Sequence, residues 1–197
     1  MSDRENLRRK IRSQRQSLSD EAIFESSLSI TERLIDSAPF KSSQRIACYL
    51  SSRGEVDTQD IIETCWALNK TVLLPILSPL GDGKLWFVRH QPGQAMRLNR
   101  YGIAEPVFSR RDLVKATQID LVLAPLVAFD NEGHRLGMGG GYYDRTFAFL
   151  NQRSYWLRPW FIGLAYHFQQ VPHLESHFWD VNLQGVITED HLQIFRR

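Results

Sequence analysis

The sequence lacks the features that would place it in a specialised structural class. Only two of its 197 residues are cysteines, Cys48 and Cys65, and they form no CxxC motif. This pattern excludes a disulfide framework and a zinc finger, and it predicts two reduced thiols in a core. No apolar run approaches the roughly 20 residues that span a membrane, and the N-terminal segment is charged. We therefore expect a cytoplasmic protein with neither a signal peptide nor a membrane span.

An excess of charge of one sign is also missing, because the formal net charge is only +2. This near-neutrality argues against a dedicated nucleic-acid-binding protein. Positive charge is nevertheless concentrated near the N-terminus, where Arg4, Arg8 and Arg12 share one face of a predicted helix. Such a face is suited to a polyphosphate. A solvated basic face over a narrow apolar stripe of Leu7 and Ile11 is the more ordinary explanation.

What the sequence does contain is an alternation of short apolar runs with helical patterns. The runs are too short to be buried helices, and apolar residues in the stretches between them recur at intervals of three and four. The predicted strands cover 45–50, 71–75, 84–89, 121–128, 161–166 and 185–188, and the predicted helices cover 7–18, 20–35, 57–68 and 143–151. This order predicts a single α/β domain over residues 1–197, with three layers and a mostly parallel sheet that has helices on both faces. The segment 101–106 is expected to be a loop.

The stretch from Ile119 to Leu150 carries the clearest functional pattern. A predicted strand stops at Asp130, a turn follows, and a cluster of four glycines precedes the helical pattern. Glycines let a backbone approach a ligand closely, and free N–H groups at a helix start attract anions, so phosphate is the expected ligand. Arg135 adds a charged fork for phosphate oxygens, and Asp144 is a hard oxygen ligand of the kind that Mg²⁺ prefers. The spacing matches neither the dinucleotide fingerprint nor the P-loop, so a glycine turn that serves only tight packing stays open as an alternative.

An acidic residue and two aromatic residues are further candidates for contact with a ligand. Glu55 follows Gly54 at the carboxyl end of the predicted strand 45–50, where open α/β sheets bind their ligands. A loop glutamate is more often simply solvated. Trp86 and Tyr101 are large enough to stack on a flat ring, but the pattern alone favours a place in the core for both.

A long motif resembles a known family. The segment RLGMGGGYYDR at 135–145, which follows PLVAFD at 125–130, is similar to the signature of the 5-formyltetrahydrofolate cyclo-ligase family. The segment LRRK at 7–10 with Arg12, the segment GEVDT at 54–58, and Asp180 with GVITE at 185–189 also resemble that family. The resemblance extends from about Arg4 to Glu189. Because the signature is long and specific, it disfavours the packing-only explanation of the glycine loop.

The resemblance implies an activity and a nucleotide site. The family converts 5-formyltetrahydrofolate and ATP, with Mg²⁺, into 5,10-methenyltetrahydrofolate, ADP and phosphate. By resemblance, Arg135 is a clamp on the phosphates, Asp144 and Asp180 hold Mg²⁺, and Arg135 and Asp144 are the catalytic residues. The expected ATP contacts are Arg4, Glu5, Asn6, Leu7, Arg8, Arg135, Leu136, Gly137, Met138, Gly139, Gly140, Gly141, Tyr142 and Tyr143.

The resemblance also implies a folate site at Leu50, Glu55 and Tyr101. Glu55 is suited to accept hydrogen bonds from the amino and ring N–H groups of the pterin. The expected partner is therefore a small molecule, a folate with or without a polyglutamate tail. No nucleic acid or membrane partner is expected, and the protein is expected to be a monomer.

Two positions depart from the family pattern, and three other functions stay open. Met138 stands where many relatives carry a basic residue, and Gln184 stands where an acidic residue is common. One alternative is an ATP-independent enzyme like a sugar-phosphate isomerase or CoA-transferase, to whose architecture the expected Rossmann-like fold is related. Another is a nucleic-acid-binding module that uses the basic helix. The third is an inactive relative that only binds folate, which the presence of Arg135, Asp144 and Glu55 together disfavours.

Overall fold

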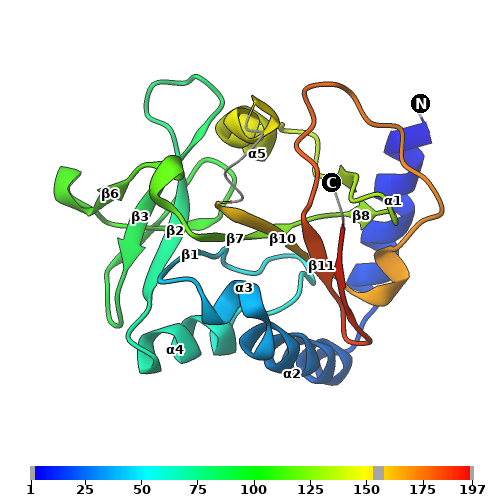
Figure 1. Cartoon of the computed structure of the whole chain (residues 1–197), viewed down its shortest axis with the longest axis horizontal. Helices are drawn as coiled ribbons and strands as arrows, with labels where there is room; N and C mark the ends of the chain where they lie inside the picture. Colours follow the sequence, from blue (N-terminus) through cyan, green and yellow to red (C-terminus); the bar gives the residue numbers. More distant parts are fainter. Residues whose placement is uncertain (1–2, 153–157, 196–197) are drawn as a thin grey trace.

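A computed structural model describes residues 3–152 and 158–195, and its centre is an eight-stranded sheet (Figure 1). The strand order is β12-β11-β10-β7-β1-β2-β3-β6. These strands are β1 (Arg45–Ala47), β2 (Thr71–Leu77), β3 (Leu85–His90), β6 (Leu113–Val114), β7 (Leu121–Pro125), β10 (Trp160–Leu164), β11 (Gly185–Ile187) and β12 (Leu192–Ile194). Two small sheets lie outside it, one of β4 (Met96–Leu98) with β5 (Ala104–Pro106) and one of β8 (Ala128–Phe129) with β9 (Arg135–Leu136).

The central strands of the large sheet are parallel, and both edges are antiparallel. β1 pairs in parallel with β2 and β7, and β10 pairs in parallel with β7 and β11. At the edges, β12, β3 and β6 run antiparallel to their neighbours. β7 is buried on both faces from Leu121 to Ala124, so it shows in the sequence as a continuous apolar run rather than an alternating one. The predicted α/β fold with a mostly parallel sheet is confirmed.

Helices cover both faces of the sheet, as predicted. They are α1 (Asp3–Gln16), α2 (Asp20–Asp36), α3 (Ala38–Lys41), α4 (Gln59–Ala67) and α5 (Tyr142–Phe147), with the 3-10 helices η1 (Arg110–Asp112), η2 (Ala116–Gln118), η3 (Ala148–Gln152) and η4 (His167–Gln169). On one face, α2, α3 and α4 pack Ile30, Phe40 and Ile62 against the sheet (Figure 1). On the opposite face, Phe147 of α5 and Leu150 of η3 pack against the alternate residues of the same strands. The result is three layers.

Helix α1 lies at the side of the sheet, next to β8 (Figure 1). Its buried residue Ile11 is 3% exposed and belongs to a small core cluster with Val127, Ala128 and Leu136. Leu7 packs against that cluster as well. The apolar stripe predicted for this helix is therefore a real packing surface, and it fixes α1 to the hairpin that precedes the glycine loop.

The strand predicted over 121–128 is wrong at its carboxyl end. β7 ends at Pro125, which has no amide hydrogen to continue the ladder. Val127 N instead donates to Leu136 O at 2.7 Å, so the chain has already turned into the β8–β9 hairpin. The helix predicted over 143–151 is also too long, because α5 ends at Phe147 and η3 follows it.

Other errors in the prediction concern short elements. The strand predicted over 45–50 ends at Ala47. The segment predicted as a loop at 101–106 contains β5, which pairs with β4. All three residues of β4 are exposed, so β4 lacks the alternation of buried and exposed side chains from which a strand is predicted.

The two cysteines are free and buried, as predicted. Burial raises the pKa of each thiol to about 12, so both stay protonated and unreactive at neutral pH. Within the described residues, no helix combines the length and the apolar character that a membrane crossing requires.

Candidate active site

A cavity of about 950 Å³ opens beside the carboxyl ends of β1, β2 and β7. Parallel α/β sheets bind ligands at this edge, and the volume is at the upper end of the range for ligand pockets. The predicted site residues that line it are Arg4, Arg8, Leu50, Glu55, Tyr101, Arg135, Gly137, Met138, Gly139, Gly140, Gly141, Tyr142, Tyr143, Asp144 and Asp180. Four predicted ATP contacts do not line it: Leu7 and Leu136 pack in the cluster around Ile11, and Glu5 and Asn6 face solvent.

The glycine loop begins after a hairpin turn that is fixed by a single buried carboxylate. Asp130, 1% exposed, accepts hydrogen bonds from the backbone N–H groups of Glu132, His134 and Leu174 and from the His134 ring. Burial by itself raises the pKa of Asp130, but these donors outweigh burial and lower it. The turn between β8 and β9 is therefore held rigidly, and it delivers the chain to the loop.

Arginines from two helices, α1 and α5, hold the glycine loop itself. Arg8 Nε of α1 donates to Gly137 O at 2.9 Å, and Arg145 of α5 donates to Gly140 O and, at 2.9 Å, to Gly83 O. Burial and the neighbouring charge of Arg4 lower the pKa of Arg8, which still leaves a guanidinium charged at neutral pH. The Arg8 charge lies beside the glycine loop. It is therefore placed to supply the positive charge that a basic residue at position 138 would supply in many relatives.

The loop requires glycine at Gly141, whose φ is +63°. A Cβ atom built on this residue would lie 2.7 Å from Arg145 Nη1, so the backbone conformation disfavours other residues and the end of the Arg145 side chain would have to move. Gly139, at φ +99°, has the same backbone requirement. Two of the four glycines predicted from the sequence to shape a ligand loop are thus favoured by its backbone conformation.

Asp144 and Arg135 form an ion pair at the bottom of this loop. Arg135 Nη2 donates to Asp144 Oδ1 at 2.6 Å, and its Nη1 donates to Val181 O. The guanidinium also lies over the Phe161 ring, 4.8 Å from its centroid, and the side chain is only 5% exposed. Arg135 lines the cavity, and its ion pair with Asp144 also orients the Asp144 carboxylate. The sequence does not suggest this second role.

Asp180 is connected to Asp144 by a backbone hydrogen bond of the residue that follows it. Val181, the residue after Asp180, donates its N–H to Asp144 Oδ1 at 3.1 Å, and Asp180 Oδ2 lies 3.8 Å from Arg4 Nη2. The described residues contain no cluster of three or more His, Cys, Asp or Glu side chains suited to a metal. Two neighbouring carboxylates are a donor set that fits Mg²⁺, because this ion usually takes one or two carboxylates and completes its shell with phosphates and waters.

Glu55 lines the cavity at a different place along α1: Arg8 contacts the glycine loop, whereas Arg15, about two helical turns later, contacts Glu55. Its Oε2 accepts hydrogen bonds from Ser52 N at 3.2 Å and Ser52 Oγ at 3.3 Å, and its Oε1 lies 3.8 Å from Arg15 Nη1. The side chain is 12% exposed, and burial raises the pKa of its carboxyl, while Arg15 and the Ser52 donors act in the opposite direction. The solvated-glutamate explanation is wrong for this residue. Leu50 lines the cavity beside it.

Tyr101 is not in the core, contrary to the expectation from the pattern alone. It is 50% exposed, and its hydroxyl lies 2.9 Å from the Tyr142 hydroxyl, to which Arg100 Nη2 also donates at 2.8 Å. The turn between β4 and β5 therefore contacts the glycine loop across the mouth of the cavity. Trp86 is partly buried and does not line the cavity.

Several residues of the cavity escaped sequence reasoning. Glu105, 6% exposed, lines the cavity while its Oε1 accepts from Leu77 N and Asn99 Nδ2, both at 2.9 Å. Arg15 of α1, which does not itself line the cavity, contacts Glu55. The seven-residue spacing from Arg8 puts it on the same helix face, a signal that was present in the sequence. Other lining residues that no sequence pattern assigned to the site include Tyr49, Ser52, Arg53, Asn99, His177 and Trp179, whereas Arg12, which shares the predicted basic face with Arg4 and Arg8, lines the cavity with them.

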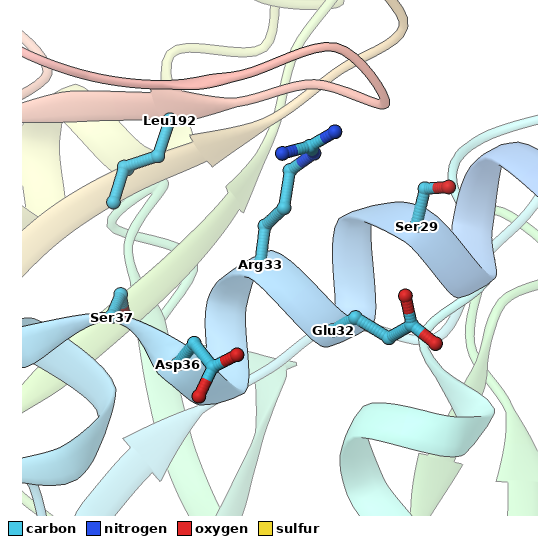
Figure 2. Close-up of a pocket in the computed structure, with 6 residues that line it drawn as sticks. All are labelled: Ser29, Glu32, Arg33, Asp36, Ser37 and Leu192. Carbon is cyan, nitrogen blue, oxygen red and sulfur yellow. The ribbon is translucent and has the colours of Figure 1, made fainter.

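A second, smaller hollow of about 430 Å³ lies elsewhere, between α2 and β12 (Figure 2). Figure 2 shows Arg33 rising from α2, with Glu32 and Asp36 on the same helix and Leu192 across from it. Arg33 Nε donates to Glu189 O at 3.0 Å. None of the predicted site residues lines this hollow, so the chemistry belongs to the larger cavity.

Comparisons with known proteins agree with one another. The model of the 5-formyltetrahydrofolate cyclo-ligase family matches residues 1–189. The chain is 36% identical over 184 residues to the 5-formyltetrahydrofolate cyclo-ligase of Haemophilus influenzae, covering 93% of this chain and 96% of the relative. It is 38% identical over 178 residues to that of Escherichia coli K12, with coverages of 90% and 96%. The fold is similar to the NMR structure of Aquifex aeolicus 5,10-methenyltetrahydrofolate synthetase, with a TM-score of 0.82, 30% identity, and coverages of 98% and 93%.

Proposed function

Since this chain belongs to the 5-formyltetrahydrofolate cyclo-ligase family, we propose that it converts 5-formyltetrahydrofolate and ATP, with Mg²⁺, into 5,10-methenyltetrahydrofolate, ADP and phosphate. One observation carries the proposal beyond family membership. The glycine loop, Asp144, Asp180 and the largely buried Glu55 all line a single cavity. A reaction between a nucleotide and a second ligand requires both ends to open into one space.

The proposed chemistry uses nucleophiles that belong to the substrate. The formyl oxygen is a poor leaving group, so it first attacks the terminal phosphorus of ATP and takes the phosphoryl group, with release of ADP. The neighbouring amine nitrogen then attacks the activated carbon, loses its proton, and expels the oxygen as phosphate. The protein's contribution to such a reaction is to position both substrates and to stabilise charge on the transferring group.

At the nucleotide end, the glycine loop is proposed to hold the phosphates. Arg8 and Arg4 supply positive charge beside it, and Asp144 and Asp180 are the proposed Mg²⁺ ligands. When bound, Mg²⁺ supplies charge neutralisation for the phosphate oxygens. Arg135 keeps Asp144 oriented through its hydrogen bond, and a direct contact of Arg135 with phosphate remains a prediction.

At the folate end, Glu55 is the proposed acceptor for the amino and ring N–H groups of the pterin. An ionised carboxylate is an acceptor only, so it pairs with the adjacent donors that this ring presents. Leu50 provides an apolar contact. Tyr101, joined to Tyr142, is proposed to close the mouth of the cavity over the folate.

The alternative functions are less well supported. Arg8 and Arg15 of the basic helix contact the glycine loop and the turn at 53–55, and such inward-facing arginines do not favour a nucleic-acid surface. The expected relationship to sugar-phosphate isomerases and CoA-transferases is not confirmed. The cytoplasmic location and the monomeric state stay predictions.

The test mixes purified protein with 5-formyltetrahydrofolate, ATP and Mg²⁺ and follows the ultraviolet absorbance of the methenyl product while each component is omitted in turn. We expect product only when all three are present, with one ADP released for each product formed. Product without ATP would contradict the proposed phosphorylation. No product from a folded protein that binds ATP would refute the folate assignment and leave the nucleotide site standing.

A further inference from the structure

Arg15 is an arginine that the protein buries almost completely, with only 2% of its side chain exposed. It lies near the carboxyl end of α1 and reaches the turn that carries Glu55. Its Nε donates to Arg53 O at 3.2 Å, and its Nη1 lies 3.8 Å from Glu55 Oε1. An arginine is almost never buried without a partner, so its contacts identify what it serves.

The backbone of this turn is fitted closely to α1. Gly54 has φ +73°, and a Cβ atom built on it would lie 2.8 Å from Arg15 O. Only glycine fits between the helix end and the turn. The contact therefore involves both the side chain and the main chain of Arg15, and it places Glu55 relative to α1 rather than leaving it on a free loop.

The charge of Arg15 has a specific effect on Glu55. A carboxylate removed from water is costly unless an opposite charge or donors lie close to it. Ser52 satisfies Oε2, whereas the cationic group near Oε1 is Arg15. Without Arg15, only the Ser52 donors and the charge of Arg53 oppose the effect of burial, so protonation of the carboxylate or its rotation toward solvent becomes more favourable and its value as an acceptor for N–H groups falls.

We propose that Arg15 is a positioning residue for folate recognition, which holds Glu55 ionised and directed into the cavity. This inference rests on the proposed function, because it gives Glu55 the pterin as its ligand. Arg15 itself does not line the cavity. Its effect on the folate is therefore exerted through Glu55.

Helix α1 does not depend on Arg15 for its position. Ile11 anchors it in the cluster with Val127 and Leu136, and Arg8 joins it to the glycine loop. Substitution of Arg15 is thus expected to disturb the turn at 53–55 while the nucleotide end of the same helix stays in place. This separation makes the proposal testable, because a general loss of structure would affect both ligands.

The test is a double-mutant cycle of Arg15→Met and Glu55→Gln. Titration calorimetry measures the dissociation constant of 5-formyltetrahydrofolate in the absence of ATP and, separately, that of MgATP. Arg15→Met is expected to weaken folate binding about tenfold and to leave MgATP binding within twofold. In the Glu55→Gln background, Arg15→Met is expected to have less than a twofold further effect on folate. Arg9→Met, which removes an exposed arginine of the same helix, is the matched control and is expected to change neither constant.

Each outcome decides the proposal. Fully additive effects in the cycle, or equal loss of both ligands in Arg15→Met, would overturn it by showing that Arg15 acts independently of Glu55. If Arg15→Met does not fold, Arg15→Gln replaces it in the same cycle, since glutamine also removes the charge but keeps amide N–H groups that can donate to Arg53 O, and the same additivity criterion applies. Failure of wild-type protein to bind 5-formyltetrahydrofolate at all would instead refute the proposed function, and the role of Arg15 in folate binding with it.

Discussion

The two ends of the cavity are built in different ways. The glycine loop of the proposed nucleotide end is one continuous segment, from Arg135 to Arg145, whose shape depends on glycine backbones, and the side chains of Arg4, Arg8 and Asp180 lie beside it. The folate end is assembled from three separate segments that contribute Arg15, Glu55 and Tyr101. The glycine loop is thus shaped mainly by its main chain, and the proposed folate end mainly by side chains.

This difference determines what each end is sensitive to. A loop shaped by positive φ angles fails when a side chain is added, because the backbone itself becomes strained. A largely buried carboxylate with a buried counter-charge fails when the charge balance changes, even though the backbone stays the same. Substitutions chosen at each end should therefore separate ATP binding from folate binding.

The largest expected loss of activity follows substitution of Asp144, because this residue is a proposed Mg²⁺ ligand and turnover requires MgATP as well as folate. Asp144→Asn keeps an oxygen that accepts from Val181 N and Arg135, so the fold should be retained, but it removes the charge proposed to hold Mg²⁺. We expect kcat to fall by at least about a thousandfold, which corresponds to about 4 kcal/mol of transition-state stabilisation. The methenyl absorbance assay measures this loss, and thermal unfolding checks the fold.

The control for that variant is binding in the absence of turnover. Asp144→Asn should bind 5-formyltetrahydrofolate as wild type does, because Glu55 and its neighbours are unchanged. Turnover within tenfold of wild type would show that Asp144 is not the main metal ligand. Loss of folate binding in the same variant would show that the two ends are not as separate as the structure indicates.

A smaller effect is expected from Gly141→Ala, which tests the main-chain end directly. The left-handed conformation costs alanine about 1–2 kcal/mol, and its Cβ would meet Arg145. We expect the KM for ATP to rise about tenfold while the dissociation constant for folate is unchanged. Steady-state kinetics and calorimetry measure the two quantities.

Gly93→Ala is the matched control for that substitution. Gly93 has φ +72°, but nothing lies within 4 Å of a Cβ atom built on it, and it lies in the turn between β3 and β4. It should lose a similar amount of stability and keep the wild-type KM for ATP. An equal rise of KM in both variants would mean that backbone strain anywhere lowers activity and that the loop is not special.

The same contrast explains what the sequence could and could not predict. The layers of the fold follow from apolar periodicity, and the glycine loop is visible because its residues are adjacent in the chain. The pairing of Arg15 with Glu55 joins residues forty positions apart, and Glu105 belongs to a strand predicted as a loop. Partners of this kind are brought together by tertiary packing, for which local sequence carries no signal beyond the helical spacing of Arg8 and Arg15.

The smallest expected effect concerns the pH dependence of folate binding, and it tests the side-chain end. Because burial raises the pKa of Glu55 above its ordinary value of 4.5 and the pterin requires the ionised carboxylate, protons compete with folate. Affinity should therefore increase as pH rises through that elevated pKa, by at most tenfold per pH unit, and become constant above it. The groups around Glu55 that set its pKa are Arg15, Arg53 and Ser52, and its charge in turn acts on Tyr49 and Tyr143. Calorimetry between pH 5 and 8 measures the dissociation constant of the folate for wild type and for Glu55→Gln. Titration of the folate itself affects both proteins equally, so the difference between the two pH profiles reports on Glu55. Identical profiles for the two proteins would mean that the pterin is not bound by this carboxylate.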